Sequence, residues 1–146
     1  MEESEKGLSG KEREQRAELQ TLVLKLRQYQ AHAEQVSQEL LLVKQAINEH
    51  DKAIETIKQL KAMKTGDELI VPIGANSSIY VTLSSTDKII VGIGGGISTE
   101  KSPDSSIEYL GRMKTNLETT QQEKSSLLQK IEQEAQKLQV RLQGLS

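Results

Sequence analysis

The residues able to do acid–base, metal or nucleotide chemistry are few in this sequence and stand far apart. Only His32 and His50 offer imidazole nitrogens, and both fall in one predicted helix, about five turns from each other. They cannot share a metal ion or a proton. The many Asp and Glu residues are spread along predicted helix surfaces, where no cleft would shift the pKa values of their carboxyl groups. We therefore expect no catalytic residue, no metal site, no cofactor and no enzymatic activity.

The glycine-rich run 92–96 is the one stretch that suggests nucleotide binding. A dinucleotide fingerprint would need another glycine three positions beyond Gly94 and a helix after it, but that position is Ile97 and strand-forming residues follow. We interpret these glycines as a tight hairpin turn within a crowded sheet. The triplet that begins at Asn76 fits a glycosylation motif, yet it is better explained as a second turn.

A heptad pattern predicts a first long helix over residues 11–64. Apolar residues alternate there every three and four positions, and this spacing, kept for more than five heptads, is typical of a coiled coil. The one polar seam residue, His50, occupies a d position, where a polar side chain commonly fixes the register of pairing. Ser9 and Glu12 have the spacing of a capping box. The twelve seam positions are Leu19, Leu22, Leu26, Tyr29, Ala33, Val36, Leu40, Val43, Ile47, His50, Ile54 and Ile57.

A weaker heptad series predicts a second helix, which Ser102 before Pro103 marks at its start. Its apolar seam residues are Ile107, Leu110, Leu117, Leu128, Ile131, Ala135, Leu138, Leu142 and Leu145. Three polar residues, Lys114, Gln121 and Lys124, fall on the same seam. The middle of this helix is therefore expected to pack loosely, with Met113 and Leu127 turned inward to compensate.

Between the helices the sequence changes to β-branched residues and glycines. Strands are predicted at 68–73, 78–83, 88–93 and 97–100, which form two hairpins. Pro72 cannot donate a ladder hydrogen bond, so its strand is placed at an edge or at a bulge.

The resulting fold class is α+β: a long antiparallel two-helix coiled coil with two β-hairpins inserted between the helices. We divide the chain into an N-terminal coiled-coil helix (1–64), an assembly domain of two hairpins (65–101) and a C-terminal coiled-coil helix (102–146).

The predicted strands carry large aliphatic side chains on both faces, since Leu69, Val71 and Ile73 point one way while Ile70 points the other. Four short strands cannot cover two apolar faces and their open edges within one chain. We therefore expect the hairpins to complete a larger sheet or an oligomeric β-barrel with other subunits. The expected assembly residues are Leu69, Ile70, Val71, Ile73, Ile79, Val81, Ile89, Ile90, Val91 and Ile93.

Composition and charge limit the classes of partner that this chain is expected to bind. The formal net charge is -2 with both signs interspersed, and aromatic residues make up 2% of the chain, so neither a basic stripe nor stacking rings favour nucleic acid. No apolar run approaches the roughly 18 residues that span a bilayer, and the acidic start lacks a signal sequence. Cysteine is absent. We expect a cytoplasmic protein that binds neither nucleic acid nor membrane.

A binding surface for other chains is expected near the free ends of the two helices. A coiled-coil seam uses its own apolar side chains, which leaves off-seam residues for a partner, and fraying of the helix ends would add seam residues. The expected binding residues are Val23, Leu24 and Val140 off the seam, and Leu19, Leu22, Leu138, Leu142 and Leu145 on it. The alternative interpretation is that Val23 and Leu24 only widen the contact between the two helices.

The stretches ELIVPIGANSSIYV (68–81) and KIIVGIGGGISTEK (88–101), placed between two helical arms, resemble the alpha-type subunits of prefoldin. Two hairpins separate this type from the beta type, which has one. The resemblance implies a hexamer of two alpha-type and four beta-type subunits joined by a double β-barrel. It also implies an ATP-independent chaperone that holds unfolded polypeptides at its coiled-coil tips and delivers them to a group II chaperonin. The alternative function is a coiled-coil scaffold or tether that binds one defined partner.

Overall fold

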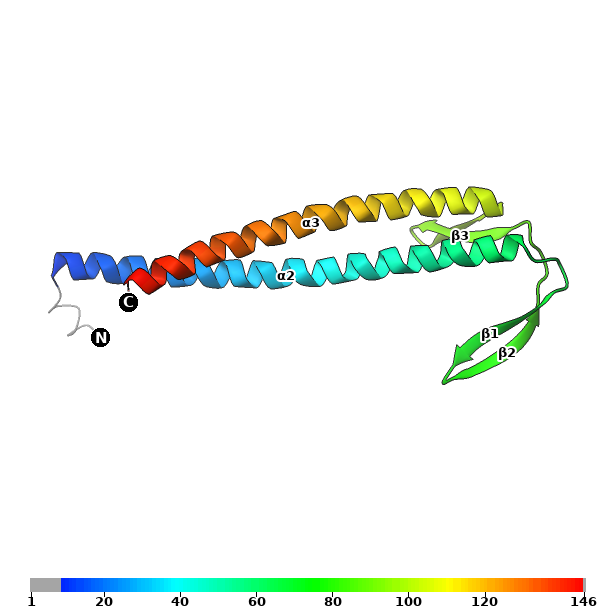
Figure 1. The fold of residues 1–146 in the computed structure, drawn as a ribbon, viewed down its shortest axis with the longest axis horizontal. Coiled ribbons are helices and arrows are strands. Elements are labelled where there is room, and N and C mark those ends of the chain that lie inside the picture. Colours follow the sequence, from blue (N-terminus) through cyan, green and yellow to red (C-terminus); the bar gives the residue numbers. More distant parts are fainter. Residues whose placement is uncertain (1–8, 146) are drawn as a thin grey trace. The chain divides into compact units, whose positions relative to one another are not determined.

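The computed structural model describes residues 9–145 and places two β-hairpins between two long helices (Figure 1). In chain order the elements are α2 (Gly10–Lys61), β1 (Glu68–Gly74), β2 (Ser77–Thr82), β3 (Ile89–Gly94), β4 (Ile97–Lys101) and α3 (Pro103–Leu145). This order confirms the predicted fold class. Internal contacts divide the chain into two compact units, which we call the terminal unit (up to Val43, and from Thr120 onward) and the central unit (Lys44–Thr119).

Helix α2 begins with the predicted capping box and ends earlier than predicted. The Ser9 hydroxyl accepts a hydrogen bond from the backbone N–H of Glu12 (3.2 Å), while the Glu12 carboxylate accepts one from the N–H of Ser9 (3.3 Å). The prediction that the helix continues to residue 64 was wrong, because it ends at Lys61. The N–H of Lys64 instead donates to the carboxylate of Asp67 at 2.8 Å, in a turn beyond the helix where Gly66 has a φ of 93°.

The seam of α2 is confirmed. In the terminal unit, Leu22, Val36 and Leu40 are buried, together with Ile131 of α3, and in the central unit Ile57 is buried. The other predicted seam residues of α2 and of α3 are half-buried in their own units. The apolar core of each unit is thus the narrow stripe between two helices that a heptad repeat produces.

The hairpins form two separate two-stranded antiparallel sheets, β1–β2 and β3–β4. Each strand bound lies within one residue of the prediction. In β1–β2 the register shifts between Pro72 and Gly74, so Pro72 lies next to the predicted bulge. The turns are two-residue turns with positive φ at both positions, Ala75 and Asn76 in one and Gly95 and Gly96 in the other. This geometry is the type I′ turn, which confirms that these residues serve as turns.

Helix α3 starts where Ser102 caps it. The Ser102 hydroxyl accepts a hydrogen bond from the N–H of Ser105 at 3.1 Å, and its carbonyl accepts one from the hydroxyl of the fully buried Ser106 at 2.8 Å. The Lys101 ammonium lies 5.3 Å from the ring centre of Tyr109, which adds a cation–π contact between β4 and the first turns of α3. The last hairpin is therefore joined to its helix without a flexible linker.

Within residues 9–145, neither helix contains a stretch long and apolar enough to cross a membrane.

Candidate binding surfaces

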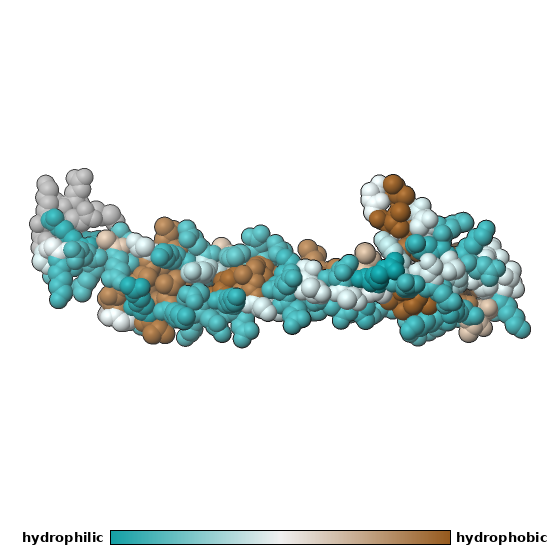
Figure 2. Space-filling view, turned by 90° about the horizontal axis from the view of Figure 1, so that it is seen from above, coloured by the Kyte–Doolittle hydropathy of each residue, from teal (hydrophilic) through white to brown (hydrophobic). Residues whose placement is uncertain are grey.

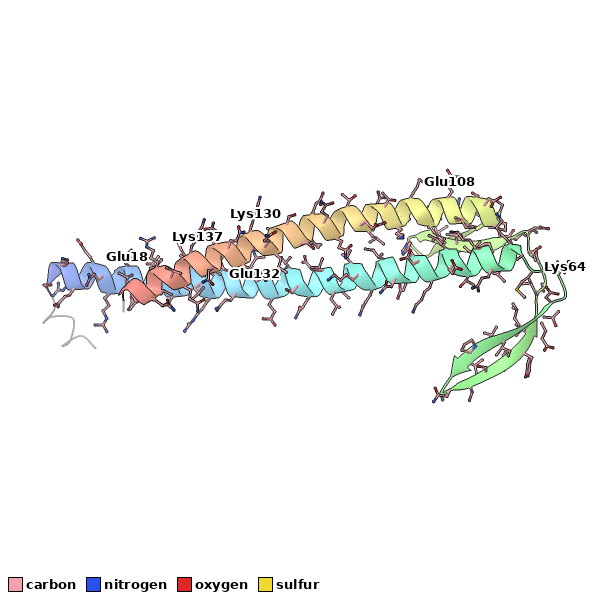
Figure 3. All side chains as sticks on the ribbon, in the orientation of Figure 1. Glu18, Lys64, Glu108, Lys130, Glu132 and Lys137 are labelled. Atoms are coloured by element: carbon pink, nitrogen blue, oxygen red, sulfur yellow. The ribbon has the colours of Figure 1, made fainter. Side chains whose placement is uncertain are left out.

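Ion pairs join α2 to α3 in both units. In the terminal unit, Arg141 binds Glu18 at 2.6 Å and Lys124 binds Glu39 at 2.7 Å. Figure 3 shows Glu18 on α2 beside the last turns of α3. In the central unit, Lys114 binds Asp51 at 2.6 Å, and Lys61 pairs with Asp104. In each unit, the paired residue with the higher number on α2 binds the one with the lower number on α3. The two helices therefore run antiparallel within each unit.

Two of these ion pairs occupy the polar middle of the α3 seam, where Met113 is half-buried. Lys114 and Lys124 keep their seam positions, with side chains only 31% and 28% exposed, because each reaches a carboxylate on α2. Leu127 does not turn inward to compensate, as it remains 40% exposed. The stems of the two lysines fill the seam while their ammonium groups stay paired at its margin.

These pairs shift two pKa values in opposite directions. The hydrogen bond from Lys124 is the main cause that holds the pKa of the Glu39 carboxyl below its usual value, with Gln35 as a second donor. The hydrogen bond to Asp51 raises the pKa of the Lys114 ammonium. The Glu39 pair therefore stabilises the fold above the carboxyl pKa of the unfolded chain, and this contribution disappears as pH falls through the lowered folded-state value.

Glu39→Gln is expected to lower the thermal midpoint at pH 7 because it removes the charge that Lys124 pairs with. At a pH below the lowered folded-state pKa of Glu39 the two proteins should differ much less, since Glu39 is then protonated in the wild type as well. Thermal unfolding followed by circular dichroism at both pH values measures this. Glu34→Gln, on an exposed residue of the same helix that makes no ion pair within residues 9–145, is the matched control and should change the midpoint at neither pH. A constant difference between Glu39→Gln and wild type at both pH values would contradict the assignment.

Apolar side chains lie uncovered near the end of the helix pair in the terminal unit. Leu24 and Val140, which sequence reasoning placed off the seam, are each 58% exposed, and Val23 is half-buried. A shallow hollow of about 370 Å³ on α2 is lined by Leu19, Gln20, Val23, Leu24 and Arg27. Apolar patches of this kind interrupt the mostly hydrophilic surface in Figure 2.

The other residues predicted for this surface are part of the seam. Leu22 is only 4% exposed, and the half-buried ones are Leu19, Leu138, Leu142 and Leu145. Of these, Leu19 alone also lines the hollow. In the terminal unit, Leu24 and Val140 are thus exposed, and Leu19 and Val23 reach the surface at the hollow.

The hairpins leave most of the predicted assembly residues exposed. The exposed ones are Ile70, Val71, Ile73, Ile79, Ile90 and Ile93, and Leu69, Val81 and Ile89 are half-buried. Val91 differs, because its own chain already covers it to 5% exposure. Sequence reasoning missed Tyr80 and Ile97, which are 72% and 61% exposed. Tyr80 could have been recognised from its place between Ile79 and Val81, because successive side chains of a strand project from opposite faces of the sheet.

Neither histidine belongs to a site in the described residues. The Nδ1 atom of His50 lies 2.7 Å from the carbonyl oxygen of Ala46, one turn earlier in α2, and its ring is half-buried in the seam. His32 is exposed. In residues 9–145, no three His, Cys, Asp or Glu side chains gather in a way that could hold a metal ion.

Comparison with known proteins points to one family. The family model described as prefoldin subunit matches residues 10–146. The prefoldin subunit alpha of Methanothrix thermoacetophila is 39% identical over 70% of this chain and 67% of its own length. The prefoldin subunit alpha of Methanosarcina barkeri is 33% identical over 88% of this chain and 91% of its own length.

A solved structure has the same fold. It is the cryo-EM structure of filamentous PFD from Methanocaldococcus jannaschii, which matches with a TM-score of 0.68 and covers 80% of this chain and 96% of that chain. Its sequence identity is 22%, so this likeness concerns the fold alone.

Proposed function

This chain belongs to the prefoldin family, among its alpha subunits, and we propose that it holds unfolded polypeptides without ATP. Prefoldins are chaperones and not enzymes. The proposal assigns to this chain one arm of a multi-subunit chaperone, acting in the cytoplasm. The bound polypeptide would then be delivered to a group II chaperonin.

The observation that supports holding most is the apolar surface near the end of the helix pair. Seam residues such as Leu22 and Ile131 are buried, so the coiled coil does not need Leu24 or Val140 for its own stability. An exposed apolar side chain on a helix attracts the apolar segments that an unfolded chain displays and a folded one hides. A short row of such side chains gives many weak, sequence-tolerant contacts. We therefore propose Leu19, Val23, Leu24 and Val140 as the first contacts, with Leu22, Leu138, Leu142 and Leu145 joining when the ends separate.

The hairpins support a separate proposal, that residues 65–101 are an assembly domain. Ile70, Tyr80 and Ile90 are among the most exposed large apolar residues of the described chain, and both sheets have two strands with free edges. Such edges join other strands readily. We propose that beta-type prefoldin subunits supply those strands and complete a β-barrel, in a hexamer of two alpha-type and four beta-type subunits.

Suppression of aggregation tests the holding function. The assembled protein should protect several unrelated denatured proteins at near-stoichiometric amounts and without nucleotide, as measured by light scattering during dilution from denaturant. A scaffold or tether would instead bind one defined helical partner and leave the aggregation of unrelated proteins unchanged. Protection that appears only with ATP would also contradict the proposal.

A further inference from the structure

Two stretches of the helices near the proposed client surface carry positive charges only. Between Glu18 and Glu34 of α2, the side chains charged at pH 7 are Lys25 and Arg27. On α3, the residues after Glu134 that carry charge are Lys137 and Arg141.

Two of the four cations are already compensated. Arg141 binds Glu18 at 2.6 Å, and Lys137 binds Glu134 at 3.2 Å. Lys25 and Arg27 are exposed, and among residues 9–145 neither makes an ion pair. The α2 side of this surface therefore carries two uncompensated positive charges.

One of these charges borders the apolar hollow directly. Arg27 lines it together with Leu19, Val23 and Leu24, and the remaining lining residue, Gln20, is neutral. No acidic residue stands three or four positions from Leu24 on the helix, the positions whose side chains lie beside it. A segment bound in the hollow would therefore meet the positive charge of Arg27 and no acidic lining residue.

We propose that this hollow prefers unfolded segments in which apolar residues are flanked by Asp or Glu. The inference rests on the proposed holding function and adds the chemistry of the segment that this arm takes. Apolar contact with Val23 and Leu24 supplies affinity, which is insensitive to charge. The cations Lys25 and Arg27 attract acidic flanks and repel basic ones, which separates clients of equal apolar content.

Three matched peptides test this preference. Each contains the same disordered Leu- and Val-rich segment, flanked on both sides by Asp, by Asn or by Lys, and binding to the assembled full-length protein is followed by fluorescence anisotropy. The Asp-flanked peptide should bind about fivefold more tightly than the Asn-flanked one, and the Lys-flanked one about fivefold more weakly, as expected for two exposed charge contacts. The differences should shrink as salt is raised, since the contacts are exposed.

A double variant assigns the preference to these residues. With Lys25→Gln and Arg27→Gln, the three affinities should fall within about twofold of one another, because the charge contacts are lost. Lys52→Gln with Lys58→Gln removes the same charge from exposed positions elsewhere on α2 and should leave the preference unchanged. Any other subunits are the same in every sample, so the difference between variants reports this arm.

The possible outcomes separate the two proposals. Equal affinities for all three peptides in the wild type, or a preference that survives Lys25→Gln with Arg27→Gln, would overturn the charge preference and leave the holding function standing. Failure of every peptide to bind would overturn both.

Discussion

Deleting residues 1–24 together with 139–146 is expected to abolish the holding of unfolded polypeptides while subunit assembly stays intact. The deletion removes Leu24, Val140 and most of the hollow, and it leaves all four strands untouched. Burying one such side chain against a bound polypeptide contributes about 1.5 to 3 kcal/mol of binding free energy. Losing Leu24 and Val140 alone should therefore raise the amount of protein needed for protection by at least about tenfold. Light scattering with two unrelated denatured proteins measures protection, and native mass spectrometry checks assembly.

A point-variant pair controls for damage to the coiled coil. Leu24→Gln with Val140→Gln keeps the full helix length and should lose most of the protection. Leu41→Gln with Leu42→Gln changes two residues of similar exposure, 57% and 65%, in another part of α2, and should keep it. Unchanged protection in both the deletion and the Leu24/Val140 variant would remove these residues from the proposed surface.

Ile70→Lys combined with Ile90→Lys is expected to prevent assembly without unfolding the helices. These side chains are 65% and 74% exposed in the single chain, so lysine costs little there. In an assembled barrel they would be covered, and a charge buried without a partner is strongly unfavourable. Two apolar contacts of about 1.5 to 3 kcal/mol each would also be lost. Native mass spectrometry should show the complex replaced by free subunits, while circular dichroism shows retained helix.

The control for this variant adds the same charge at polar positions of the same region. Ser84→Lys with Ser98→Lys changes two exposed serines and should assemble as the wild type does. Normal assembly of Ile70→Lys with Ile90→Lys would show that the apolar faces of the hairpins are not the contact surface.

Most of the fold could be predicted because its signals are local and repeated. The heptad rule located every seam residue of α2 from Leu19 to Ile57, since the rule depends only on spacing along one helix. The strand bounds followed from the change in composition at 65–101, and Pro72 indicated a bulge because it lacks a donor. The turn at Asn76 was recognisable because asparagine accepts positive φ.

The parts that could not be predicted depend on contacts between distant residues or on competition at helix ends. Lys114 and Lys124 looked like defects of the α3 seam, and only the alignment of α3 on α2 shows that Asp51 and Glu39 stand opposite them. Beyond the end of α2 at Lys61, the N–H of Lys64 binds the Asp67 side chain and does not continue the helix. Val91 matches its neighbours in type, and only the folded chain shows that it is covered.

Only some residues of the proposed client surface could be identified from the sequence. Leu24 and Val140 were identified because they lie off the seam, and both are exposed. The role of Arg27 was not identified, because a basic residue on a helix is usually only a solvated one. Its place at the edge of the hollow distinguishes it.

The most direct test of the account is a native mass measurement of this chain alone and mixed with a beta-type prefoldin subunit, in dilute buffer. The account predicts that the mixture forms a complex with the mass of two copies of this chain and four of the partner, because the hairpins of one chain cannot cover their own isoleucines. A stable, compact monomer that remains alone when the partner is added would contradict it.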